Sequence, residues 1–276
     1  MVVRFAAAVV ILLGCGGTYA EATVDLDALS RIATGGAKTP TEKVRAAIDW
    51  THQNMSWTAT DYKRRTVEQI IERKGGNCFD QTLVVSDLLT RVGVKTRHIR
   101  EINIQPRSEG RRASAADRVA KDGFSASVFG YQHNDHVWIE YWDSVRGEWQ
   151  PADPTTNVVG IKEWEQGRVS FAPRGKADVV ALQDMIVPIG VLAEIEGQKN
   201  VFENRSEHYL IDGFGNYVSG AKDTREWHTW VQSIRAEQRH IEGAFAGTYN
   251  LEQDDEGAIE ALRRTYDSMK AQSARR

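Results

Sequence analysis

Three residues whose side chains together can carry out acyl transfer occur in order along this 276-residue sequence: Cys78, His136 and Asp153. A cysteine thiolate can attack a carbonyl carbon, an imidazole can move the proton of the leaving group, and a carboxylate can orient the imidazole. The sequence therefore contains every group that a cysteine nucleophile with a supporting His–Asp pair requires. Whether they form one site depends on the elements that carry them.

The first of these residues belongs to the stretch Gly75-Gly76-Asn77-Cys78, which opens an apolar helical run that ends near Gly93. Asn77 is a favourable N-cap, so the pattern predicts that Cys78 lies in the first turn of a helix. There the unpaired backbone N–H groups and the positive end of the helix dipole favour a thiolate. The alternative is that Cys78 is a small buried apolar residue at a helix start.

The other two residues lie on a predicted β-hairpin. Residues 136–142 are rich in β-branched and aromatic side chains, 143–147 form a turn, and 148–153 return. A loop of two residues (144–145) or four (143–146) would place Asp153 directly opposite His136, with Cβ atoms about 5 Å apart. A loop of three or five residues would turn the two side chains to opposite faces. The alternative for His136 alone is a histidine at the exposed end of a strand.

The N-terminal residues are predicted to form an export signal. Arg4 is followed by an apolar stretch over residues 5–13 that is too short to span a membrane. Cleavage after Ala20 would remove a signal peptide of residues 1–20, whereas a lipoprotein signal would end before a lipidated Cys15. Because Cys15 and Cys78 are the only two cysteines, Cys78 then has no partner for an internal disulfide. We expect a periplasmic or extracellular protein. If the signal is that of a lipoprotein, a lipid anchor at Cys15 would be its only membrane contact.

Composition sets further limits. Hydrophobic residues make up 41% of the chain, charged residues 26%, and the net charge is −3. No basic stripe interleaved with aromatic residues is present, which argues against binding to nucleic acid. The length suits one core with a helical annex, and we expect a core over residues 23–160 and an extension over residues 161–276. No cofactor is indicated.

The remaining pattern predicts the elements around the hairpin. We expect helices, strands and loops as follows: a helix from Thr39 to about Asn54, a short helix at 66–74, a strand at 94–104, a surface loop at 105–123, a strand at 125–131, a strand and glycine turn at 209–217, an amphipathic helix from Asp223 and a last helix from about Asp255.

A metal site is the weaker alternative for the same residues. Its ligands would be Cys78, His133, Asp135 and His136. The residue types are suitable, but a His-x-x-His pair at a strand start with one distant cysteine is not a recurrent zinc spacing.

Taken together, the motifs resemble the transglutaminase-like superfamily, a papain-related group of cysteine enzymes with exported bacterial members. The resemblance covers roughly residues 40 to 160. The residues that carry it are the helix segment 46–50, Gly75-Gly76-Asn77-Cys78, the segment 88–97, His136-Val137-Trp138-Ile139-Glu140, Trp149, and Asp153-Pro154-Thr155.

The resemblance implies an α+β, papain-like core in which the nucleophile helix packs on an antiparallel sheet, with a C-terminal extension that is largely helical at its end. It implies that Cys78 is the nucleophile, His136 the general base and acid, and Asp153 its orienting partner. The oxyanion would be held by the backbone N–H of Cys78 and an upstream side chain, either Gln53 or Trp57.

Such an enzyme would act on amide bonds of proteins or peptides through a thioester acyl-enzyme, either as a peptidase or amidase or as an acyltransferase. The alternative is an inactive binding module on the same fold, for components of the cell envelope or matrix.

Overall fold

The computed structural model describes residues 24–58, 63–103, 136–169, 188–198, 201–217, 220, 222–246, 248–249, 251 and 255–273. The predicted export signal, the loop at 105–123 and the strand at 125–131 lie outside these residues. So do His133 and Asp135, two of the four ligands in the metal alternative.

The centre of the described structure is an antiparallel sheet of six strands in the order β6-β5-β4-β3-β7-β8. Its strands are β3 (Thr96–Asn103), β4 (His136–Asp143), β5 (Glu148–Asp153), β6 (Val158–Val159), β7 (Pro188–Glu194) and β8 (Phe202–Asn204). The strand that begins at His136 is therefore an interior strand, with β5 on one side and β3 on the other.

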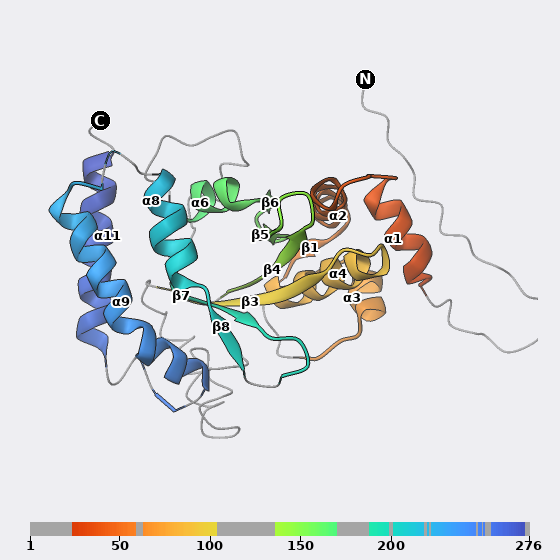
Figure 1. The fold of residues 1–276 in the computed structure, drawn as a ribbon. Coiled ribbons are helices and arrows are strands. Elements are labelled where there is room, and N and C mark those ends of the chain that lie inside the picture. The colour runs from red at the N-terminus through yellow and green to blue at the C-terminus, as the bar shows by residue number, and fades with distance from the viewer. Residues whose placement is uncertain are drawn as a thin grey trace, which may run out of the picture.

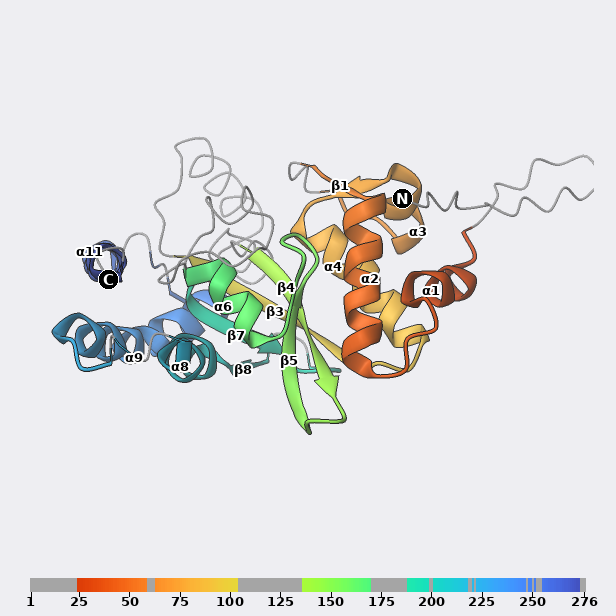
Figure 2. The ribbon, with the colours of Figure 1, turned by 90° about the horizontal axis from the view of Figure 1, so that it is seen from above.

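Helices from the N-terminal part of the chain cover one face of this sheet (Figure 2). They are α1 (Leu26–Thr34), α2 (Pro40–Asn54), α3 (Val67–Arg73) and α4 (Cys78–Arg91). The start of α2 confirms the helix expected from Thr39, because the Thr39 hydroxyl accepts from the backbone N–H of Glu42 and the Glu42 carboxylate accepts from that of Thr39. Apolar residues of α2 and α4 pack against Ile139 and Tyr141 of β4.

The opposite face is covered by elements that follow the hairpin, as Figure 1 and Figure 2 show. They are α6 (Ile161–Val169), a π-helical turn η2 (His208–Gly213), α8 (Phe214–Tyr217), α9 (Arg225–Ala246) and α11 (Glu256–Ser273). The long helices α9 and α11 lie side by side at the C-terminal end (Figure 1). This face contains the aromatic core, in which Trp138, Trp164 and Tyr209 are fully buried.

The expected strand and glycine turn at 209–217 is wrong, because this segment is helical. Its buried residues Tyr209, Leu210 and Phe214 follow the spacing of a helix face rather than the alternation of a strand. Gly213 serves close packing here, since a Cβ at this position would collide with the Glu165 carboxylate of α6. A glycine in the sequence can thus indicate either a turn or a close approach between elements.

The extension shares the sheet with the core. Strand β7 pairs with β3 along most of its length, and β8 pairs with β7. The sheet therefore continues past residue 160, where we expected the core to end. Within the described ranges, no helix combines the length and the apolar character that a membrane span requires.

Candidate active site

Cys78 is the first residue of α4, in agreement with its expected place in the first helical turn. Asn77 caps the helix by accepting a hydrogen bond from the backbone N–H of Asp80 at 3.0 Å. The Asp80 carboxylate accepts one from the backbone N–H of Asn77 at 3.3 Å, which completes a capping box. Cys78 is half-buried and is a free cysteine. The cap thus determines where the helix begins and which residue lies at its start.

The two glycines before the cap are required by close packing. They form the short strand β2 (Gly75–Gly76), which runs parallel to β1 (Ser56–Trp57). A Cβ on Gly76 would overlap Cβ of Asp80 and lie 3.0 Å from its Cγ. A Cβ on Gly75 would lie 3.0 Å from the carbonyl oxygen of Ser56. The turn thus has no room for larger residues between β1 and the capping carboxylate.

The N-terminal half of α4 lies against the start of β4. The buried hydroxyl of Thr82 donates a hydrogen bond to the carbonyl oxygen of Val137 at 3.1 Å. Thr82 is four residues after Cys78, so both lie on the same side of α4, with their Cβ atoms about 6 Å apart. Val137 directly follows His136. This single hydrogen bond ties the helix that carries the cysteine to the strand that carries the histidine.

His136 and Asp153 are in direct contact. His136 Nε2 lies 2.8 Å from Asp153 Oδ2. The expected register was wrong by two residues, because the loop spans 144–147 and Asp143 pairs with Glu148. The register ends at Ile139 and Ala152, and its continuation by one residue would place Asp153 opposite Trp138, with His136 as its diagonal neighbour on the same face of the sheet. Diagonal neighbours remain within reach of a long or aromatic side chain, which explains why the contact survives the shift.

The environment of the pair holds both side chains in place. Asp153 is fully buried, and its second oxygen, Oδ1, accepts a hydrogen bond from the backbone N–H of Thr155 at 2.9 Å. The side chain of His136 is 13% exposed and stacks on Trp138, with ring centroids 6.0 Å apart and an interplanar angle of 29°. Trp138 itself packs against Trp164 and Tyr209. The imidazole therefore packs on the buried aromatic core and is only slightly exposed to solvent.

The two residues considered for the oxyanion lie in different surroundings. Trp57 belongs to β1 and pairs with Gly76, two residues before Cys78. Its side chain is 60% exposed. Gln53 is exposed near the end of α2. Between the two, Trp57 has the closer backbone connection to the nucleophile turn.

Three residues that help to build this site were not singled out in the sequence. Asp80 could have been found, because Asn77-x-x-Asp80 has the spacing of a capping box. Trp138 alternates with His136 on the same face of a strand, so its proximity also followed from the pattern. No sequence signal indicates the contact of Thr82 with β4, because that contact joins segments 55 residues apart.

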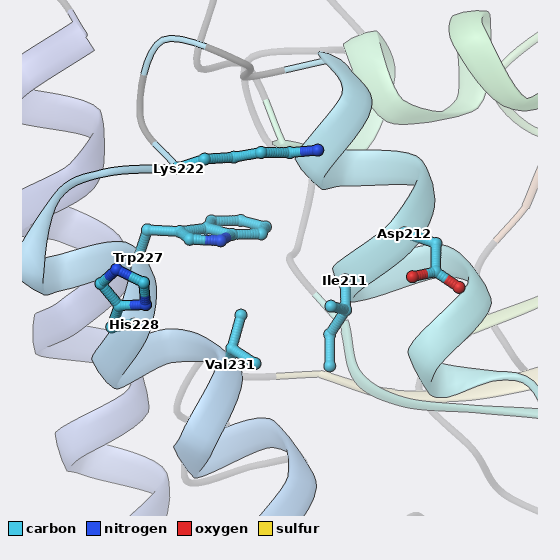
Figure 3. Close-up of a pocket in the computed structure, with 6 residues that line it drawn as sticks. All are labelled: Ile211, Asp212, Lys222, Trp227, His228 and Val231. Atoms are coloured by element: carbon cyan, nitrogen blue, oxygen red, sulfur yellow. The ribbon is translucent and has the colours of Figure 1, made fainter.

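A separate pocket lies in the extension (Figure 3). Its volume is about 440 Å³, and its lining residues are Ile211, Asp212, Lys222, Trp227, His228 and Val231. Figure 3 shows the Lys222 side chain running alongside the Trp227 ring. None of the three predicted catalytic residues lines this pocket, so we do not assign it to the candidate active site.

Comparison with known proteins supports the assignment of the fold. The model of the transglutaminase-like superfamily matches residues 27–154, a segment that contains Cys78, His136 and Asp153. This segment is similar to transglutaminase-like domains, and its fold belongs to the α+β class expected from the sequence. No curated protein matches the sequence.

The solved structures that match the chain are distant in sequence. A candidate cysteine protease from Cytophaga hutchinsonii is 18% identical, with a TM-score of 0.34 over 49% of this chain and 39% of that one. Red sea bream transglutaminase is 12% identical, with a TM-score of 0.39 over 66% of this chain and 37% of that one. Rad4–Rad23 bound to a 6-4 photoproduct UV lesion is 9% identical, with a TM-score of 0.36 over 90% and 55%. The chain thus aligns with less than two thirds of each of these proteins.

Proposed function

We propose that this protein is a cysteine enzyme that acts on amide bonds of proteins or peptides, with Cys78 as nucleophile, His136 as general base and acid, and Asp153 as orienting residue. The observation that carries the proposal is the 2.8 Å contact between His136 Nε2 and the fully buried Asp153 carboxylate. A carboxylate accepts hydrogen bonds, so it favours the tautomer of a neutral imidazole with the proton on Nε2. The lone pair is then on Nδ1, the nitrogen that would accept the thiol proton.

The reaction would follow from these positions. The Cys78 thiol transfers its proton to His136 Nδ1, and the thiolate attacks the amide carbonyl carbon. The backbone N–H of Cys78 lies at the start of α4, where such groups lack partners within the helix, and it would stabilise the oxyanion together with an upstream donor such as the indole N–H of Trp57. His136 returns the proton to the leaving amine. The resulting thioester is released by water in a hydrolase or by a primary amine in an acyltransferase.

The decisive variants are Cys78→Ala and Cys78→Ser. Both replace one half-buried side chain at a helix start, so the free energy of unfolding should change within the ~0.5–3 kcal/mol typical of point mutants. Activity should be almost abolished in both, since a serine hydroxyl is far less acidic than a thiol. Release of ammonia and of short peptides from protein substrates, with and without added primary amines, would separate hydrolysis from acyl transfer.

The competing function is a binding module on the same fold. The position of Cys78 as the first residue of a capped helix beside the strand of His136 favours the enzyme. A Cys78→Ala protein that retains both its ligand affinity and its effect in the cell would contradict the enzyme and support the binding module.

We also propose that the protein is exported. The support is the charged and apolar pattern of residues 1–20, which is typical of a signal peptide. Mass spectrometry of the mature protein should find an N-terminus at Glu21, or at a lipidated Cys15. Recovery of the chain with residues 1–20 intact from the cytoplasmic fraction alone would exclude export.

A further inference from the structure

A group of three potential metal ligands lies in the extension, outside the transglutaminase-like domain. Glu237 and His240 are three residues apart on α9, so their side chains share one face of the helix. Asp255 directly precedes α11. His240 Nδ1 lies 3.2 Å from Glu237 Oε2 and 2.6 Å from Asp255 Oδ2. One ligand atom from each residue lies within 4.8 Å of the other two.

The charges of this group do not balance. Two carboxylates face a single imidazole, so a negative charge remains even when His240 is protonated. No lysine or arginine among the described residues forms an ion pair with Glu237 or Asp255. Glu237 is buried, with only 7% of its surface exposed. A bound cation would remove this excess of negative charge.

Tyr249, in the segment between the two helices, holds the ligands in position. Its hydroxyl donates a hydrogen bond to Asp255 Oδ2 at 2.6 Å. Its ring lies parallel to the imidazole of His240, with centroids 4.5 Å apart and an interplanar angle of 8°. Metal ligands in proteins commonly have such outer contacts, which fix the ring orientation and the carboxylate before the ion arrives.

We propose that Glu237, His240 and Asp255 bind a divalent transition-metal ion, with Zn²⁺ as the best-suited ion. Zn²⁺ accepts imidazole nitrogen and carboxylate oxygen at about 2.0–2.2 Å, and a water molecule would complete a tetrahedral site. Mg²⁺ and Ca²⁺ favour all-oxygen sites and fit this donor set less well. The Glu-x-x-His spacing on one helix is also used by di-iron proteins that bind metal between helices.

The ion would act as a structural clip. It would join the start of α11 to the middle of α9, and α9 in turn packs on β7 of the central sheet. Binding to the folded state alone would raise the thermal stability of the protein. None of the three predicted catalytic residues is a ligand of the proposed metal site. An experiment that refutes the metal site therefore leaves the proposed function untouched, and the reverse also holds.

The test uses the full chain with Cys78→Ala, which removes the thiol that could bind Zn²⁺ at the candidate active site. After treatment with a chelator, titration calorimetry with ZnCl₂ should give one ion per chain and a higher melting temperature. The same concentration of MgCl₂ or CaCl₂ should change the melting temperature little. Absence of Zn²⁺ binding would overturn the proposal.

Single substitutions assign the ion to these residues. Asp255→Asn retains an acceptor for Tyr249, and His240→Gln keeps a polar side chain, yet each should weaken Zn²⁺ binding by at least about tenfold. His228→Gln is the matched control, because His228 is an exposed histidine on the same helix. Equal Zn²⁺ affinity in Asp255→Asn and in the control would refute the site. Anomalous scattering at the zinc edge provides a second measurement, and a peak remote from the three side chains would also refute it.

Discussion

Substitution of Gly76 by alanine tests how the nucleophile turn is held. The added Cβ would overlap Cβ of Asp80 and lie 2.9 Å from its Oδ2 and 3.0 Å from its Cγ. Because non-bonded carbon atoms prefer to stay about 3.5–4.0 Å apart, either the backbone at residue 76 or the Asp80 side chain must move by roughly 1 Å. Either movement would disturb the capping box, since the bonds between Asn77 and Asp80 are 3.0 and 3.3 Å long.

The backbone of Gly76 is also held in place. Its carbonyl oxygen accepts from the backbone N–H of Thr58 at 3.0 Å and from the Gln81 side chain at 3.3 Å. Overpacking costs about 1–3 kcal/mol, and each hydrogen bond lost costs about 0.5–1.5 kcal/mol. Gly76→Ala should therefore lower the free energy of unfolding by roughly 2–4 kcal/mol.

Gly76→Ala should also lower the reactivity of Cys78. A shift of about 1 Å at a reacting group can reduce the rate about 100-fold. The rate of alkylation of Cys78 by iodoacetamide measures this without knowledge of the substrate, and urea denaturation measures the stability. Gly257→Ala is the control, because a Cβ there meets nothing within 4 Å. If Gly76→Ala matches the wild type in both measurements, the close-packing argument is wrong.

Three further predictions concern the buried polar groups. Asp153→Asn should lower turnover, though less than Cys78→Ala, because it weakens the orientation and charge of His136 without removing the nucleophile; equal turnover in Asp153→Asn and wild type would contradict the role of the carboxylate. Burial raises the pKa of Glu165 to about 8 from 4.5. Between these pH values the folded state keeps a proton that the unfolded state has lost, so the free energy of unfolding should fall as the pH rises from about 4.5 to 8. Glu165→Gln should reduce that decline and raise the free energy of unfolding at pH 8 by a few kcal/mol, as measured by denaturation across this range; an unchanged slope would refute the argument. Tyr209→Phe removes a 2.6 Å hydrogen bond to the fully buried Glu140, which should lower the free energy of unfolding in urea by about 1–3 kcal/mol. Arg97 and Arg205 also donate hydrogen bonds to that carboxylate, and a loss below about 0.5 kcal/mol would show that these two suffice.

The sequence alone determined the parts of the site that depend on near neighbours. The start of α4 at Cys78 follows from Asn77, because a cap acts on backbone groups two or three residues away. The shared face of His136 and Asp153 was one of the two outcomes that strand alternation allowed, and any even shift of the hairpin register preserves it. The start of α2 at Thr39 followed in the same way from its capping box.

Only the tertiary structure decided which segments meet. The register of the hairpin differs by two residues from the expected one, and Asp153 also pairs with Val158 of β6, a strand that no local pattern predicted. The hydrogen bond of Thr82 to Val137 and the addition of β7 and β8 to the sheet join segments far apart in the chain. Local propensities act over a few residues, whereas these contacts depend on how helices and strands pack around a common core. For that reason the sequence indicated the chemical groups, whereas the contact of His136 with Asp153 and the packing of α4 against β4 depended on the tertiary structure.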